Sequence, residues 1–221
     1  MEHPKISNEE MKTRIVRFKD LKKSPIAVMF IDSVLPRHHR LNYAVIGDTA
    51  SENPDFKPLI TSLHKFQIGV VCAPPRSGPA WHTHDYIELF MPLKGKWKFY
   101  WGDSPDGTVK GSAVLDEWDI ISCPPGQWRS FENVSKEDGW IFAVLEPHEA
   151  FKAKDPYWGS QVLKQAASMG FRADDSGKMI KPANFKEVEK EVFDNLVRKK
   201  KAPPARKPAG KKPVARKQAK R

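Results

Sequence analysis

Two histidines and a glutamate, His82, His84 and Glu88, lie within seven positions of one another. Imidazole nitrogens and carboxylate oxygens are ligands of divalent transition metals, and three such ligands leave coordination positions open for a substrate or for dioxygen. On an extended chain, residues two positions apart point to the same side, so His82 and His84 can face one ion together. A lone H-x-H pair occurs often without a metal, so a second motif is needed to support this interpretation.

That second motif follows about thirty residues later. The segment His82-x-His84-x₃-Glu88-x₆-Gly95 resembles the first signature of the cupin superfamily, and Pro124-x-Gly126-x₂-Arg129-x₃-Asn133 resembles the second, P-x-G-x₂-H-x₃-N. The matching positions are His82, His84, Glu88, Gly95, Pro124, Gly126 and Asn133.

Three positions depart from the cupin pattern. The leading glycine of the first signature falls on Arg76, and the leading glycine of the second falls on Trp118. The last metal-binding histidine of the pattern is Arg129. The departure at Arg129 matters most for function because it lies at a ligand position.

The resemblance covers about residues 62–147 and implies a single cupin domain. It implies an all-β core, a double-stranded β-helix or jelly-roll barrel, with a metal at its centre held by His82, His84 and Glu88. Fe(II) is the first choice of metal, and Zn, Mn and Ni are the alternatives. Cupin barrels commonly pair through their outer sheets, so the resemblance also implies a homodimer.

Arg129 stays protonated and offers only hydrogen-bond donors, so it cannot bind a metal. In one interpretation His82, His84 and Glu88 suffice, and Arg129 is a catalytic residue that holds a substrate carboxylate or enolate through paired hydrogen bonds. In a second, Arg129 forms an ion pair with Glu88 or Glu132 and the protein only binds a ligand. In a third, Gln127 or His148 has taken over the ligand role.

The resemblance leads to an expected function. The first hypothesis is a metal-dependent cupin enzyme, a non-haem Fe(II) dioxygenase that acts on a small organic or aromatic acid, with an anionic small molecule as its partner. One alternative is a metal-dependent cupin without a redox step, namely an isomerase, lyase or decarboxylase. Another is a non-catalytic ligand-binding cupin in which Arg129 replaces the last metal histidine.

The elements that would position these residues divide the chain into four parts. Residues 1–60 are an N-terminal extension that contributes strands to the barrel, and 61–147 form the barrel itself. Residues 148–197 form a helical extension, and 198–221 form a disordered tail rich in Lys, Ala and Pro.

Within these parts, apolar runs of strand length and turn residues indicate individual elements. Lys94-Gly95 indicates a hairpin between two strands. Asp155-Pro156 and Asn184 indicate helix starts, and Gly170 is placed to end the first of the two helices. The expected strands are 14–18, 26–31, 41–46, 66–72, 86–93, 96–101, 112–115, 118–122, 128–132 and 140–145.

Charge and composition limit the remaining functions. Of the 38 Lys and Arg residues, 12 lie in 198–221, which leaves 26 against all 27 Asp and Glu in 1–197. The positive charge therefore belongs to the tail, where weak contact with a polyanion is expected. Cys72 and Cys123 lie in apolar stretches and read as reduced thiols of a cytoplasmic protein. No apolar run approaches membrane-spanning length, so no membrane contact is expected.

Overall fold

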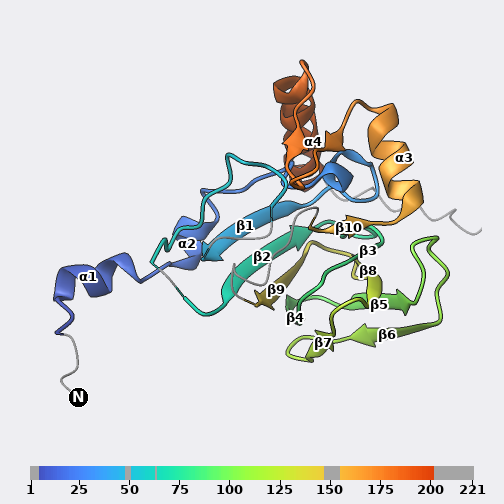
Figure 1. The fold of residues 1–221 in the computed structure, drawn as a ribbon. Helices are drawn as coiled ribbons and strands as arrows, with labels where there is room; N and C mark the ends of the chain where they lie inside the picture. Colours follow the sequence, from blue (N-terminus) through green and yellow to red (C-terminus); the bar gives the residue numbers. More distant parts are fainter. Residues whose placement is uncertain (1–4, 48–50, 63, 147–154, 202–221) are drawn as a thin grey trace, which may run out of the picture.

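Two five-stranded antiparallel sheets make up the body of the protein. The computed structural model describes residues 5–47, 51–62, 64–146 and 155–201, with side chains up to residue 197. The strand order is β1-β2-β9-β4-β7 in the first sheet and β10-β3-β8-β5-β6 in the second (Figure 1). The first sheet comprises β1 (Leu41–Ile46), β2 (Gln67–Ala73), β9 (Gly139–Leu145), β4 (Glu88–Lys94) and β7 (Ile121–Cys123). The second comprises β10 (Tyr157–Trp158), β3 (His82–Thr83), β8 (Trp128–Asn133), β5 (Trp97–Gly102) and β6 (Gly111–Leu115).

The two sheets face each other across an aromatic core. Alternate residues of β9 are buried, as expected for strands with one face turned inward. The Phe90 ring of the first sheet lies 4.6 Å from the Phe131 ring of the second, and the Phe131 ring stacks 4.5 Å from that of Phe99. Ten antiparallel strands in this order form the predicted jelly roll, so the fold class expected from the sequence is confirmed.

The turn at Lys94-Gly95 does not form the predicted hairpin. Strand β4 pairs with β7 and β9, whereas β5 pairs with β6 and β8, so the chain changes sheets at this turn. Gly95 has φ +83°, the left-handed conformation that glycine adopts without strain. A tight turn therefore was predicted correctly, but its local residues do not reveal which strands pair.

The N-terminal extension contributes less to the sheets than the sequence predicts. Only 41–46 forms a strand as expected, as β1. The predicted strand 14–18 is wrong, because this segment links two helices, and 26–31 makes one isolated bridge, at Ile26, before a 3₁₀ turn. The three elements are α1 (Asn8–Thr13), α2 (Phe18–Leu21) and η1 (Ile31–Val34), with α1 standing away from the body (Figure 1).

The C-terminal part forms two helices that lie above β1 and β10 in the view of Figure 1. Helix α3 (Ser160–Ser168) begins later than predicted, because Tyr157 and Trp158 pair with β3 as β10. Gly170 follows α3 with φ +86°, consistent with its predicted role. A short hairpin of β11 (Arg172–Ala173) and β12 (Met179–Ile180) precedes α4 (Phe185–Lys201).

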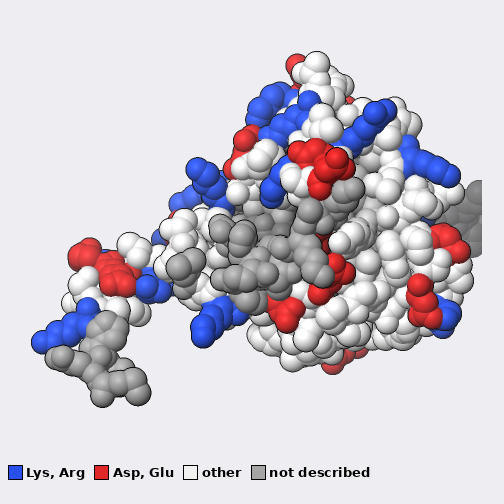
Figure 2. Space-filling model, viewed as in Figure 1, with Lys and Arg blue, Asp and Glu red and all other residues white. Residues whose placement is uncertain are grey.

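Helix α4 extends past the predicted start of the tail at residue 198. Residues 202–221, most of the predicted disordered tail, lie outside the described residues. In the view of Figure 2, basic side chains gather around α4 and the N-terminal segment, and the surface over the β body is largely uncharged. Among the described helices, none has the length and apolar character needed to cross a membrane.

Candidate metal centre

The structure brings His82, His84 and Glu88 together inside the barrel. His82 begins β3, His84 follows that strand directly, and Glu88 begins β4 in the opposite sheet. One ligand atom from each residue can be chosen so that all three lie within 4.8 Å of one another, and all three side chains are buried. The cluster could therefore hold a divalent metal ion.

Hydrogen bonds fix both imidazole rings with one nitrogen turned toward the cluster. Nδ1 of His82 lies 2.7 Å from the carbonyl oxygen of Ala80, which can only accept, so Nδ1 carries the proton. Nδ1 of His84 lies 2.6 Å from Oδ1 of Asp155, and its Nε2 lies 3.5 Å from Oε2 of Glu88. When Nδ1 carries the proton, Nε2 of each ring is the nitrogen that can bind a metal.

Asp155 is a site residue that the sequence did not reveal. Its side chain is 6% exposed, and besides His84 it binds the hydroxyl of Tyr86, which donates to Oδ2 over 2.7 Å. The Tyr86 ring stacks on His84 with centroids 4.6 Å apart. Asp155 was expected to start a helix, and no sequence signal connects it to His84, which precedes it by 71 positions.

Electrostatics favour the neutral imidazole that a metal needs. Burial, and after it the nearby charge of Arg129, holds the pKa of His82 well below its usual range. Burial and the Asp155 carboxylate raise the pKa of Tyr86, so its hydroxyl stays protonated and continues to donate to Asp155. The donor set of two imidazoles and one carboxylate fits a divalent ion.

Arg129 contacts the cluster, as the second interpretation of the sequence expected. It lies opposite His82 in the pairing of β3 with β8, and its side chain is 1% exposed. Its Nη2 donates to Oε2 of Glu88 over 2.6 Å, and its Nη1 donates to the carbonyl of Gln127 over 3.0 Å. The guanidinium and Nε2 of His84 thus approach the same oxygen of Glu88.

Glu132, Gln127 and His148 gain less support from the structure. Glu132 accepts a hydrogen bond from Tyr100 over 2.7 Å and pairs with Arg37 at 3.7 Å, so its recorded contacts lead away from the metal centre. The side-chain amide of Gln127 donates to the carbonyl of Gly102 over 2.6 Å, so this contact already engages its nitrogen. His148 lies outside the described residues.

Two small cavities adjoin the centre. One, of about 70 Å³, is bordered by His82, His84 and Glu88 and could hold one or two waters or a diatomic molecule. The other, of about 200 Å³, is lined by Arg129 together with Phe99, Tyr100 and Ile121 among others. Arg129 thus contacts Glu88 and also borders the larger cavity.

Backbone conformation supports the alignment of both motifs, including the substituted positions. Arg76 and Trp118, which stand where the two signatures have their leading glycines, are the two non-glycine residues with positive φ among those described. A non-glycine residue in this region is uncommon and costs conformational energy. The four φ values are 61° at Arg76, 83° at Gly95, 74° at Trp118 and 76° at Gly126.

Comparison with known proteins finds similarity in solved structures alone. No family model and no curated protein matches the chain. A cupin 2 domain-containing protein from Halorhodospira halophila is 11% identical over 57% of this chain and 75% of its own, with a TM-score of 0.41. The cupin domain of Cnp3 from Schizosaccharomyces pombe is 18% identical over 50% of this chain and 66% of its own, with a TM-score of 0.35.

The DMSP lyase DddQ from Ruegeria pomeroyi is 16% identical over 53% of this chain and 50% of its own, with a TM-score of 0.40. The chain thus spans about half the length of this lyase. Similarity at these levels transfers no activity. The double-stranded β-helix of the cupin type rests on the strand order and on the four left-handed motif positions.

Proposed function

We propose that this protein is a metal-dependent enzyme of the cupin type, a non-haem Fe(II) dioxygenase that acts on a small organic acid. The observation that carries the proposal is the convergence of His82, His84 and Glu88, whose ligand atoms lie within 4.8 Å of one another in the barrel. Two imidazoles and one carboxylate with open positions are the ligand set of non-haem Fe(II) oxygenases. A bound ion would supply orientation of the substrate and of dioxygen, together with redox chemistry.

The two cavities suggest where the proposed substrate binds. The space of about 70 Å³ beside the ligands has no room for the body of an acid, so that body would lie in a larger cavity. The cavity of about 200 Å³ that Arg129 borders has the size for such an acid. In this arrangement the substrate carboxylate binds the guanidinium of Arg129, as fork-shaped donors bind carboxylates in general.

In this proposal the guanidinium of Arg129 can pair with either of two carboxylates, that of Glu88 or that of the substrate. Without substrate it pairs with Glu88 at 2.6 Å, which neutralises both charges in the buried interior. A substrate carboxylate would compete with Glu88 for the guanidinium and leave the carboxylate of Glu88 to its metal. Arg129 would in this way couple substrate binding to the strength of the metal site.

Metal content is the direct test. Full-length protein purified without chelator should contain about one divalent ion per chain, and His84→Ala should lose it. His64→Ala is the control, because His64 is bound to the carbonyl of Ser62 and lies outside the ligand cluster. Protein that stays far below one ion per chain after anaerobic incubation with Fe(II), Mn(II) or Zn(II) would refute the metal site.

Oxygen uptake tests the redox step. The Fe(II)-loaded protein should consume dioxygen with a small carboxylic acid, and His84→Ala should abolish this uptake while His64→Ala preserves it. A metal site that selects Zn(II) or Ni(II) and supports no oxygen uptake would favour an isomerase, lyase or decarboxylase.

The contact between Arg129 and Glu88 favours a second candidate, a cupin that binds a ligand without catalysis. A divalent ion beside a fixed guanidinium is opposed by Coulomb repulsion, which the low dielectric of the barrel strengthens. If Arg129 impairs the site, Arg129→His should raise metal affinity at least tenfold, because it removes the charge and adds a ligand. In the enzymatic proposal, wild-type protein already binds metal stoichiometrically, and the same substitution abolishes turnover of the acid.

A further inference from the structure

A further cavity lies outside the candidate metal centre. It has a volume of about 670 Å³, within the range of pockets that bind small molecules. Its walls come from the second sheet on one side and from α3 and β11 on the other. Six of its lining residues have side chains suited to binding a ligand, namely Glu52, Thr83, Trp128, Tyr157, Trp158 and Phe171.

Glu52 is a buried carboxylate with only neutral partners among the described side chains. It is 1% exposed, and its two oxygens accept one hydrogen bond each, from the backbone of Ile31 at 2.6 Å and from the indole of Trp158 at 2.8 Å. A carboxylate offers about four acceptor positions, so two of them remain. A buried charge without a counter-charge is unfavourable, and a cationic ligand would remove that penalty.

Thr83 adds a polar group whose hydroxyl lacks a partner. Its side chain is 7% exposed, and its hydroxyl finds no hydrogen-bond partner within the part of the chain that the structure describes. Buried hydroxyls without partners are rare in folded proteins and call for an explanation. Because Thr83 lines the same cavity as Glu52, a ligand with several donors could satisfy both.

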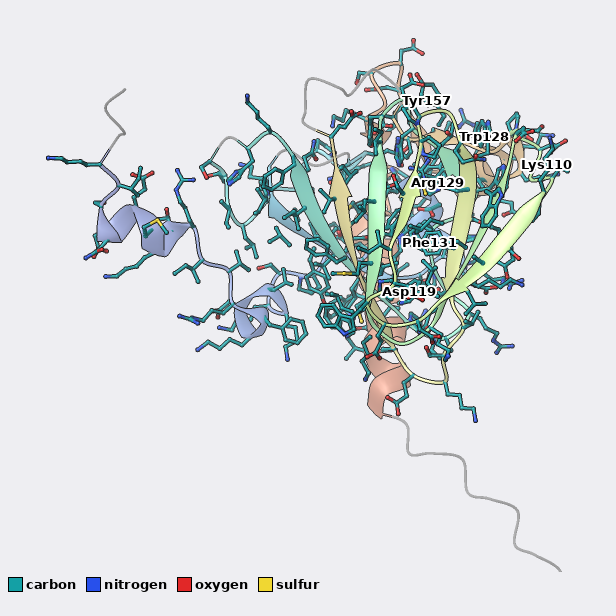
Figure 3. The ribbon with its side chains drawn as sticks, turned by 90° about the horizontal axis from the view of Figure 1, so that it is seen from below. Lys110, Asp119, Trp128, Arg129, Phe131 and Tyr157 are labelled. Atoms are coloured by element: carbon teal, nitrogen blue, oxygen red, sulfur yellow. The ribbon has the colours of Figure 1, made fainter. Side chains whose placement is uncertain are left out.

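Aromatic side chains and charge point to the class of ligand. Trp128, Tyr157 and Trp158 line the cavity, and indole and phenol rings attract cations through their faces. The acidic and basic residues of the lining are four carboxyl groups and one guanidinium, namely Glu52, Asp85, Asp174, Asp175 and Arg172. Figure 3 places Tyr157 and Trp128 near Arg129, at the end of the barrel away from Asp119.

We propose that this cavity binds a protonated primary amine with an apolar body, its ammonium group against Glu52 and Thr83 and its body among the aromatic side chains. An ammonium group has three donors and no acceptor, which matches a carboxylate and a hydroxyl that both have free acceptor positions. The metal centre is a different site, where the guanidinium of Arg129 favours an anionic substrate. Trp158 and Pro156 border both cavities, and the Trp158 ring lies 5.5 Å from that of His82.

Calorimetry with three matched probes tests the proposal on the full-length protein. The probes are 2-phenylethylamine, 2-phenylethanol and 3-phenylpropionate, which share a phenyl ring and differ in charge. The amine should bind at least tenfold more tightly than the alcohol, because a hydrogen bond between charged groups is about twice as strong as a neutral one. The acid should bind most weakly. Equal affinity for the amine and the alcohol would overturn the proposal.

Substitutions separate the roles of the lining. Glu52→Gln should weaken amine binding at least tenfold and leave the alcohol within about threefold, whereas Trp128→Leu should weaken both probes. Glu187→Gln on the exposed first turn of α4 is the matched control and should change neither. Amine binding that survives Glu52→Gln unchanged would overturn the proposal, as would amine binding that is lost in the metal-site variant His84→Ala.

Proton release offers a readout that needs no substitution. Burial raises the pKa of Glu52 to about 8, and Asp32 and Asp155 add to this effect, so the group is largely protonated in the free protein near pH 7. The titratable or charged groups that also line the cavity are Asp85, Tyr157, Arg172, Asp174 and Asp175. An ammonium group favours the carboxylate, so binding near pH 7 should release about one proton, and binding near pH 9 about none. Release of no protons near pH 7 would contradict the contact with Glu52, even if Glu52→Gln failed to fold.

Discussion

Two arginine–carboxylate pairs are buried within the described part of the protein, and they differ in the number of hydrogen bonds that each carboxylate accepts. In the pair between Asp32 and Arg40, Nη1 and Nη2 of the arginine reach one carboxylate oxygen each, both at 2.9 Å. The backbone of Ala80 donates to Oδ2 of the same carboxylate, also at 2.9 Å. Both side chains are at most 1% exposed.

The pair between Glu88 and Arg129 is similarly buried but has a single contact. One guanidinium nitrogen reaches Oε2 of Glu88 at 2.6 Å, and Nε2 of His84 lies 3.5 Å from the same oxygen. Within the described part of the chain, no backbone N–H donates to the Glu88 carboxylate. Asp32 therefore accepts hydrogen bonds on both carboxylate oxygens, whereas Glu88 accepts one on Oε2 within the described residues.

The difference separates an ion pair with both carboxylate oxygens bonded from one with a single contact. The bidentate pair joins η1 to β1 and to the segment that precedes His82, so it fixes the wall of the metal cavity, which Arg40 also lines. The single contact of Arg129 can be exchanged for a metal ion or a substrate carboxylate at little geometric cost. Substitutions that remove one partner should therefore have different consequences in the two pairs.

The largest effect is expected for Asp32→Asn. It preserves the shape of the side chain but leaves the charge of Arg40 buried without a counter-charge, and it should lower the free energy of unfolding by about 3–5 kcal/mol. Urea denaturation measures this loss. The control is Asp20→Asn, whose exposed pair with Lys23 should contribute less than about 1 kcal/mol. A loss at Asp32 as small as that at Asp20 would show that the bidentate pair does not hold the wall.

A smaller loss, and one that metal reverses, is expected for Arg129→Met. Without metal, Glu88 keeps a buried charge with no cation, so the free energy of unfolding should fall by about 2–3 kcal/mol. Addition of Zn(II) or Mn(II) should restore most of this stability, since the ion takes the place of the guanidinium as counter-charge.

The matched variant is Arg40→Met, which removes the other arginine. It should be at least as destabilising, and metal should not rescue it, because Asp32 does not belong to the ligand cluster. Thermal unfolding of both variants with and without metal compares them directly. Equal rescue of the two variants would abolish the distinction between the pairs.

The next effect concerns Asp155, which contacts His84 in the candidate metal centre. Asp155→Asn removes the charge that fixes the His84 tautomer and should lower metal affinity by about 10–100-fold. Asp119→Asn is the control, since Asp119 caps a turn at the opposite end of the barrel (Figure 3). Metal titration in competition with a chelator measures both. Unchanged affinity in Asp155→Asn would remove Asp155 from the site.

The two pairs also show what could be predicted from the sequence. His82, His84 and Glu88 were found because they lie within seven positions and because strand periodicity turns the two histidines to one side. The contact of Arg129 with Glu88 was one of two predicted pairings, since the second motif places Arg129 at a ligand position. Most residues of the candidate site could thus be predicted from their spacing in the sequence.

Contacts that the fold alone creates could not be predicted. No local pattern marks Asp32 and Arg40 as buried partners, and their burial depends on how η1 packs against the sheets. Asp155 reaches His84 only because the chain returns after the barrel to add β10 beside β3. The strands themselves were recognised by their apolar runs, but the change of sheet at Gly95 has no signature that distinguishes it from a hairpin.

The smallest expected effect is the difference between two lysine substitutions. Lysine keeps the charge of arginine but lacks the planar fork, so it can replace one contact but not a bidentate pair. Arg129→Lys should cost less than about 1 kcal/mol, and Arg40→Lys about 2 kcal/mol, because the latter loses one hydrogen bond between charged groups. Chemical denaturation at matched pH resolves a difference of this size. If both variants lose the same stability, the fork of Arg40 contributes nothing beyond its charge, and the two pairs differ only in their neighbours.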